Sequence, residues 1–158
     1  MASISALIYT FYRAALEKEA ASELTQIAIQ VKDSLVKVYD IGKNSNVRPG
    51  NFSSVLLTEL DLNLPDNVAN LNYEVNLITA NPLYTYVTQV AIDDVNVSAV
   101  RNNPVAKIIA VTTQDPIVKV EFDIPNIDFT VQGKSRNGLD DMLRLYKHNE
   151  NSTVYNTV

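Results

Sequence analysis

The chain contains neither proline nor glycine before Gly42, and this constrains its fold more than any other feature. Good helix formers, namely Ala, Leu, Glu, Lys and Gln, are frequent between Ile4 and Ile41. The pattern predicts one uninterrupted helix of about 38 residues, about 57 Å long at about 1.5 Å per residue. The remaining residues can form one compact domain, with a radius of gyration of about 13 Å per hundred residues. Part of the helix must therefore extend beyond its own domain.

The second part of the helix, residues 17–41, is amphipathic. Its apolar residues recur at spacings of three and four, which places them on one face of a helix. Residue 20 is an alanine on this face, and the five larger side chains predicted to pack against the β-domain are Leu24, Ile27, Val31, Leu35 and Val38. Gly42 is predicted to cap the helix, because glycine adopts the left-handed conformation without steric cost.

The first part, residues 1–16, is named here the apolar tip. Residues 1–12 carry no charge, and their apolar side chains cover nearly every side of a helix, which is typical of burial in protein or in lipid. The predicted assembly or membrane face consists of Ile4, Leu7, Ile8, Phe11, Ala15 and Leu16. Twelve residues are too few to span a bilayer, which needs about 20. Tyr9, Phe11 and Tyr12 beside Arg13 are nevertheless typical of a membrane interface.

Two interpretations of the apolar tip follow. In the first, upstream apolar residues have been removed from a longer helix that reaches the membrane. In the second, the chain begins natively at Met1 and the tip is buried in a homodimer.

After the helix, residues 43–54 form a predicted linker that contains the strong breaker Pro49-Gly50. Residues 55–158 read as short alternating strands separated by Pro, Asn and Asp turns. Strands are predicted within 60–64, 73–77, 83–92, 95–100, 107–113, 118–124 and 127–131, with a flexible loop over 133–138. Residues 139–148 fit a short helix or a strand, and we favour a strand because the sheet is available for pairing. The predicted fold class is α+β: a long N-terminal helix followed by an antiparallel, Ig-like β-sandwich.

Several kinds of chemistry are disfavoured for this chain. The net charge is −5 with no basic cluster, which argues against nucleic acid as a partner. Cysteine is absent, and His148 is the single histidine. Asp93-Asp94 and Asp140-Asp141 are adjacent pairs whose side chains diverge on a strand, so turn capping is favoured over a calcium site. We expect no enzymatic activity, no cofactor, no metal and no small-molecule substrate.

The surface composition is typical of an exported module, rich in Asn and Thr. Three Asn-Xaa-Ser/Thr sequons are candidate glycosylation sites, at Asn51, Asn96 and Asn151. The expected location is the cell surface.

The order of parts resembles archaeal type IV pilin-like proteins. The resemblance is carried by SALIYTFYRAALEKEAASEL leading into the amphipathic helix, and by residues 13–39 followed by a strand that ends in Leu62-Asn63-Leu64-Pro65. It implies an N-terminal helix that is cleaved by a class III signal peptidase and packs into a filament core. Identical or related subunits would then be the partners, with the membrane reached through upstream apolar residues. The alternative is a soluble Ig-like binding module that dimerises through its helix.

Overall fold

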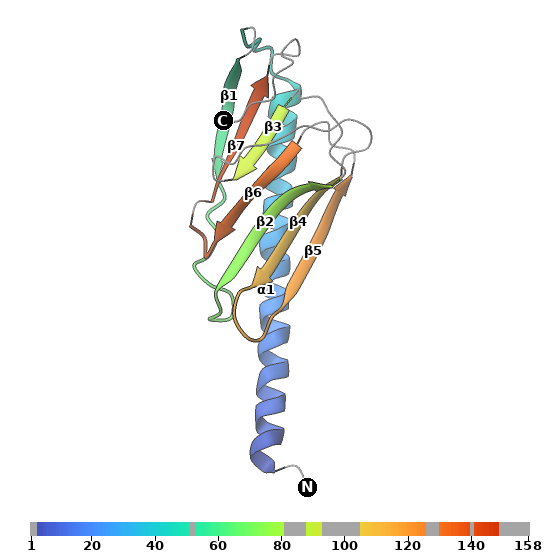
Figure 1. The fold of residues 1–158 in the computed structure, drawn as a ribbon, viewed down its shortest axis with the longest axis vertical. Helices are drawn as coiled ribbons and strands as arrows, with labels where there is room; N and C mark the ends of the chain where they lie inside the picture. Colours follow the sequence, from blue (N-terminus) through green and yellow to red (C-terminus); the bar gives the residue numbers. More distant parts are fainter. Residues whose placement is uncertain are drawn as a thin grey trace.

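The computed structural model describes residues 3–50, 53–80, 88–92, 105–125, 130–139 and 141–148. One long helix is followed by seven strands, and the helix lies along one face of the sheet that the strands form (Figure 1). The elements are α1 (Ile4–Lys43), β1 (Ser54–Asp61), β2 (Tyr73–Ala80), β3 (Thr88–Ile92), β4 (Val105–Thr112), β5 (Lys119–Pro125), β6 (Thr130–Arg136) and β7 (Met142–His148). The class is therefore α+β.

The strand order is β1-β7-β3-β6-β2-β4-β5. β6 joins two groups of strands, because residues 130–132 pair with β3 whereas residues 133–136 pair with β2. Every pairing between the described strands is antiparallel except that of β3 with β6, which is parallel. The prediction of a wholly antiparallel sheet is therefore wrong at this one pairing.

The hydrophobic core lies between α1 and the sheet. Leu24, Ile27, Val31, Leu35 and Val38 are buried there, none more than 3% exposed. They meet alternate residues of the strands, since every second side chain of a strand points to the same face. These core residues of the sheet include Tyr73, Val75, Leu77, Ala106, Ile108, Ala110, Val131, Leu143 and Leu145.

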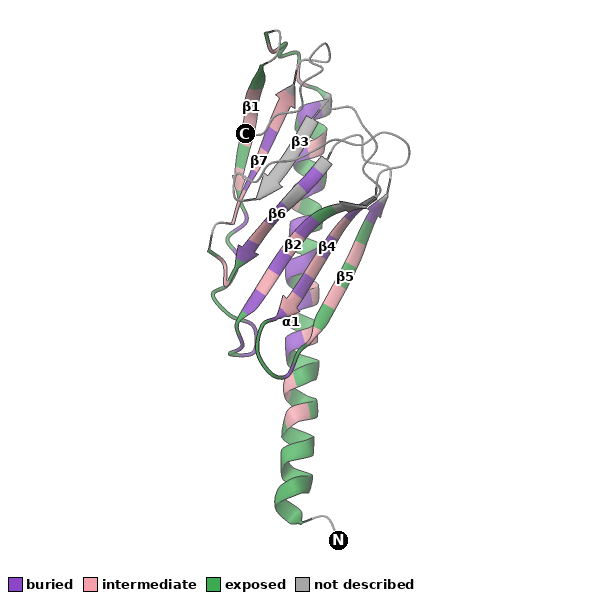
Figure 2. Ribbon diagram, viewed as in Figure 1, coloured by how far each residue is buried: buried purple, intermediate pink, exposed green. Residues whose placement is uncertain are grey.

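An Ig-like sandwich is not confirmed. In the described part of the chain, the buried face of the strands is covered by α1 and not by a second sheet (Figure 2). The opposite face carries the charged side chains that alternate with the core, such as Glu74, Lys107 and Arg144.

Two expected boundaries differ from the structure. α1 continues to Lys43 and is capped by Asn44, so the predicted cap at Gly42 is wrong. The side-chain amide of Asn44 donates to the carbonyl oxygen of Asp40 at 2.8 Å, which satisfies a terminal carbonyl without a left-handed glycine. The first strand, predicted within 60–64, instead runs from Ser54 to Asp61. Residues 62 and 64 are buried beyond it, and residue 63 breaks the strand with a φ of 49°.

The predicted loop over residues 133–138 is also wrong. Residues 133–136 belong to β6, and only Asn137 and Gly138 make the turn towards β7. Both turn residues have positive φ, 48° and 67°, as in a type I′ turn, and the turn is closed by the bridge between Arg136 and Leu139. A Cβ atom on Gly138 would lie 2.8 Å from the carbonyl oxygen of Pro65 and closer still to that of Leu64, so glycine is needed here. The strand predicted within 139–148 is confirmed as β7.

Some predictions fall on residues that the structure does not describe. These are the strand over 95–100, the first residues of the strands over 83–92 and 127–131, and the pair Asp93-Asp94. The three sequon asparagines, Asn51, Asn96 and Asn151, also lie outside the described residues.

The helix–sheet contact makes a stability prediction. Leu24→Ala removes a fully buried side chain from the core and is expected to lower the free energy of unfolding by about 3 kcal/mol. Ile41→Ala, at a helix position that is 49% exposed, should change it by less than about 0.5 kcal/mol. Urea unfolding followed by circular dichroism measures both, and equal effects would contradict the assigned core.

Candidate assembly surface

The apolar tip projects from the head, and no described strand of the head covers it. From Ile4 to Tyr12 every residue is exposed, and this part of α1 extends past the end of the sheet (Figure 2). With 40 residues at about 1.5 Å each, α1 is about 60 Å long. Buried residues on it begin only at Ala20.

Ser3 and Thr10 of the tip form hydrogen bonds within the helix. The Ser3 hydroxyl accepts a hydrogen bond from the amide of Ala6 at 3.3 Å, which caps the N-terminus. The Thr10 hydroxyl donates to the carbonyl oxygen of Ala6 at 2.8 Å. The outer surface between these groups is apolar, so the tip offers hydrophobic contact and little directional polar recognition.

Five of the six predicted assembly residues are exposed. Ile4 is 78% exposed, Phe11 68% and Ile8 63%, while Leu7 and Ala15 are also exposed. Leu16 differs because it is half-buried against a small cluster of Ala20, Ala69 and Leu71. Leu16 therefore belongs to the contact between helix and head and not to the free surface.

Two tyrosines extend this surface beyond the predicted set. Tyr9 is 58% exposed and Tyr12 is 66% exposed. At about 100° per residue, Tyr12 lies among the predicted residues and Tyr9 lies beside Leu16, so both widen the same apolar side of the helix. The large exposed side chains of the tip thus cover more than half of the helix circumference, and Ala6 and Thr10 lie on the remainder.

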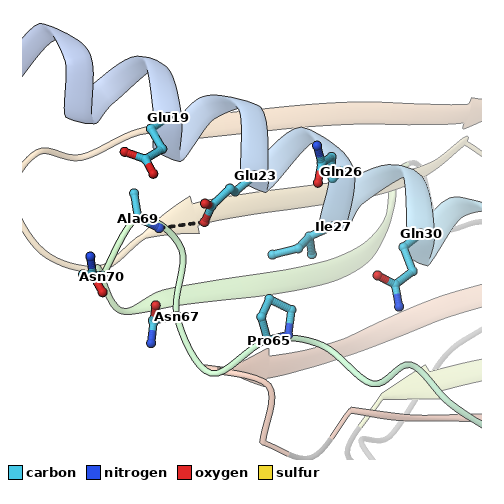
Figure 3. Close-up of a pocket in the computed structure, with 9 residues that line it drawn as sticks. All are labelled: Glu19, Glu23, Gln26, Ile27, Gln30, Pro65, Asn67, Ala69 and Asn70. Carbon is cyan, nitrogen blue, oxygen red and sulfur yellow. Dashed lines mark hydrogen bonds between the residues drawn. The ribbon is translucent and has the colours of Figure 1, made fainter.

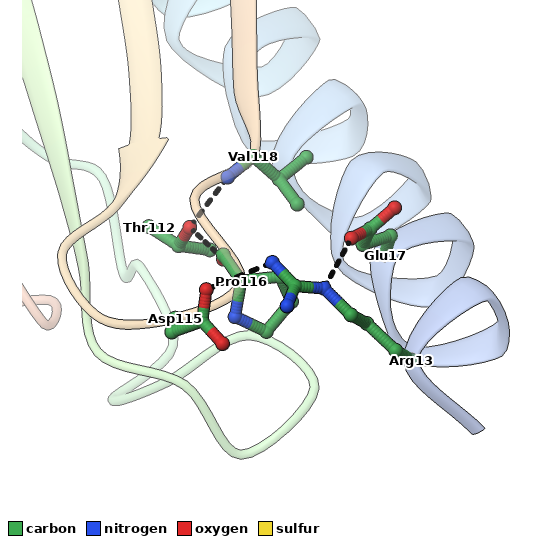
Figure 4. A network of polar contacts seen from close by, with 6 residues as sticks. All are labelled: Arg13, Glu17, Thr112, Asp115, Pro116 and Val118. Atoms are coloured by element: carbon green, nitrogen blue, oxygen red, sulfur yellow. Dashed lines mark hydrogen bonds and ion pairs between the residues drawn. The ribbon is translucent and has the colours of Figure 1, made fainter. Parts of the chain in front are cut away.

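Arg13 marks the boundary between tip and head (Figure 4). Its guanidinium group donates to Glu17, one turn along α1, at 3.0 Å, and to Asp115 of the β4–β5 loop at 2.9 Å. The hydrogen bond to Glu17 and the charge of Asp115 raise the pKa of Arg13 above its usual value. This link joins the helix to the end of the head from which the tip projects.

The β4–β5 loop is held in place by Thr112, whose side chain is buried. The Thr112 hydroxyl donates to the carbonyl oxygen of Pro116 and accepts from the amide of Val118, both at 2.7 Å (Figure 4). The loop that carries Asp115 is therefore shaped by one side chain at the end of β4.

A groove of about 460 Å³ lies beside α1, against the loop between β1 and β2 (Figure 3). The Glu23 carboxylate accepts a hydrogen bond from the amide of Ala69 at 2.7 Å, and the Gln30 amide donates to the carbonyl oxygen of Leu62. These contacts tie the loop to the helix. The described residues contain no cluster of three or more metal-ligating side chains, and the lining of this groove includes no Ser, Thr, Cys, Lys or His.

Several ion pairs lie on the solvent face of the sheet. Lys107 and Lys119 donate to Glu121 at 2.5 and 2.7 Å, while Arg136 donates to Glu74 at 2.8 Å. The hydrogen bonds from Lys107 and Lys119 lower the pKa of Glu121 to about 2. The paired charges on this face neutralise one another, whereas the described part of the apolar tip carries no such pairing up to Arg13.

Comparisons with protein-family models, with curated proteins and with solved structures found no match to this chain. Among the described residues, no helix is both long enough and apolar enough to cross a membrane.

The two hydrogen bonds of Thr112 predict that its side chain stabilises the loop at the base of the tip. Thr112→Val keeps the side-chain shape but leaves the amide of Val118 and the carbonyl oxygen of Pro116 without this partner. The free energy of unfolding should fall by about 1–3 kcal/mol. Thr113→Val, at the exposed neighbouring position, is the matched control and should change it by less than about 0.5 kcal/mol. Thermal or urea unfolding measures the difference, and equal stabilities would contradict the role of Thr112.

Glu121 makes a prediction about pH. Because its pKa is about 2 in the folded protein and 4.5 ordinarily, the unfolded chain takes up a proton first as the pH falls. The stabilisation is complete above about pH 4.5 and is lost as the pH approaches about 2. Between about pH 5 and about pH 3, wild type should lose more stability than Glu121→Gln in urea unfolding. Parallel losses in the two proteins would show that this carboxylate is not held charged.

Proposed function

We propose that this protein is a non-enzymatic structural subunit, pilin-like in organisation and located at the cell surface. It attaches through its N-terminal helix, either to identical or related subunits in a filament or to the membrane. The observation that carries the proposal is the exposure of the apolar tip, in which every residue from Ile4 to Tyr12 is exposed. A protein that kept this surface in water would be prone to aggregate.

The energy available from the tip is substantial. Full burial of one large apolar side chain contributes about 1.5–3 kcal/mol. Burying the six large exposed side chains of the tip would contribute on the order of 10 kcal/mol, before the cost of lost translational and rotational freedom. The six are Ile4, Leu7, Ile8, Tyr9, Phe11 and Tyr12. That amount supports stable assembly without any contribution from the head.

The two parts of α1 have different roles, which supports a pilin-like subunit. Residues from Ala20 to Val38 hold the head, while Ile4 to Tyr12 remain free, so one helix serves both as scaffold and as attachment. The solvent face of the sheet is polar and would face outward, and glycans at the sequons would add to it. In this proposal neither nucleic acid, a cofactor nor a small-molecule substrate is required.

The test compares the full chain with Leu7→Gln/Phe11→Gln, because glutamine is a good helix former and leaves the helix intact. Wild type should associate with itself in sedimentation velocity or bind to phosphatidylcholine–phosphatidylglycerol vesicles in flotation. In the double variant, self-association and vesicle binding should each be at least about tenfold weaker than in wild type. Its thermal stability should be unchanged, because the substituted side chains are exposed.

The matched control is Leu56→Gln, which is also exposed. It lies on β1, in the part of the head away from the tip (Figure 1). This variant should behave like wild type. Self-association without vesicle binding would favour the soluble module that dimerises through its helix. A wild-type chain that stays monomeric and does not bind vesicles would overturn the proposal.

A further inference from the structure

A second surface runs along α1 on the side that faces away from the sheet. Ala15, Ser22, Ile29 and Val36 recur at every seventh residue, and all four are exposed. These four residues are named the outward stripe. Ile29 and Val36 are each 44% exposed. The same seven-residue repeat reaches back to Ile8, so the outward stripe is continuous with the apolar tip.

The outward stripe has the spacing and the residue sizes of a helix-packing surface. Three of its four residues are apolar, and the fourth, Ser22, is small. A side chain repeated every seven residues stays on the seam between two helices that pack along their length. The outward stripe is therefore better suited to contact with a partner helix than to exposure to solvent.

Charged residues of opposite sign flank the outward stripe. Lys18 and Lys32 each lie three positions after a stripe residue, while Glu19 and Asp33 each lie four positions after the same residues. At about 100° per residue, positions three and four along lie about 60° to one side and about 40° to the other. One edge of the stripe is therefore basic and the other acidic at these two levels, and all four side chains are exposed.

These four charges differ from those of the sheet. Within the described residues, Lys18, Glu19, Lys32 and Asp33 make no ion pair, whereas the charges on the solvent face of the sheet are extensively paired. Basic and acidic edges on opposite sides of one helical stripe complement each other best across a pair of molecules.

We propose that the outward stripe docks a second copy of this chain, with the two α1 helices parallel and in register. In a parallel pair related by a twofold axis, the acidic edge of each helix faces the basic edge of the other. Glu19 then meets Lys18 of the second copy, and Asp33 meets its Lys32, with each contact repeated by symmetry. An antiparallel pair places the acidic edges together and the basic edges together, which is repulsive.

The shape of the surface fits this pairing. Ala15 and Ser22 allow the helix axes to approach at the lower end of the usual range of about 8–10 Å, while Ile29 and Val36 supply apolar area. The sheet lies on the other side of α1 and leaves the stripe open (Figure 1). The two apolar tips then project in the same direction, as entry into one membrane or one filament requires.

This inference goes beyond the proposed function, because Ser22, Ile29 and Val36 lie alongside the head, and Ala15 alone of the stripe belongs to the apolar tip. Its test is therefore performed both in the wild-type background and in Leu7→Gln/Phe11→Gln. If the tip has no role in association, the rate of cysteine cross-linking still tests pairing through the outward stripe.

The chain has no cysteine, so single cysteines report proximity cleanly. In a parallel pair in register, Ala15→Cys should form a disulfide with Ala15→Cys of another molecule, and Ile29→Cys should do the same with itself. Both should cross-link under mild copper-phenanthroline oxidation at least about tenfold faster than the exposed control Ser54→Cys, since a disulfide needs Cα atoms within about 7 Å. Rates equal to the control in both backgrounds would overturn the inference.

Orientation is decided by mixing the two cysteine variants. An antiparallel pair centred on Ser22 brings Ala15→Cys of one molecule beside Ile29→Cys of the other. The parallel pair instead favours the two like products. A mixed product that forms faster than both like products would overturn the parallel arrangement.

The charged edges are tested by Lys18→Glu/Lys32→Glu, which makes both edges acidic. This change should slow cross-linking at Ala15→Cys about tenfold, because like charges then face each other across the pair. Adding Glu19→Lys/Asp33→Lys exchanges the two edges and should restore the rate. Failure of this restoration would contradict the assigned ion pairs.

Discussion

The packing of one face of α1 on the sheet is the contact on which the rest of the structure depends. The sheet's buried face and the helix's buried stripe cover each other, and the hydrophobic core is shared between them. Because buried residues occupy the helix from Ala20 to Val38, they hold it along about 27 Å of its roughly 60 Å. Much of the remaining helix is free for contacts outside the head, and this is the geometric origin of the apolar tip.

The charges of the molecule are distributed according to what each surface meets. On the solvent face of the sheet, carboxylates and basic groups lie opposite one another on neighbouring strands and neutralise each other. At the base of the tip, Arg13 connects the helix to the β4–β5 loop. Beyond Arg13 there is no charged side chain as far as the described start of the helix. The apolar region is therefore sharply bounded, and its boundary coincides with the end of the head.

Local patterns predicted the elements well where the local signal was strong. The apolar spacing of α1 and the alternation within 118–124 correspond to the buried positions of α1 and to the inner side of β5. Glycine was a poorer guide to the ends of helices and strands. Gly42 lies within α1 and Gly133 lies within β6. In β6, position in the sheet outweighs the local preference of glycine. Asn44 and Asn137 took the capping and turning roles, and asparagine in so Asn-rich a chain is ambiguous from sequence alone.

The sequence by itself determined that a long helix precedes a β-domain, that one helical face is buried, and that apolar side chains cover nearly every side of the tip. These features are set by neighbours three or four residues apart on a helix and two apart on a strand. Tertiary structure alone decided that α1 and not a second sheet covers the buried face of the described strands, that β6 joins the two groups of strands, and that Leu16 belongs to the head. Alternation shows that one face of a strand is buried but not what buries it, because that depends on residues distant in the chain.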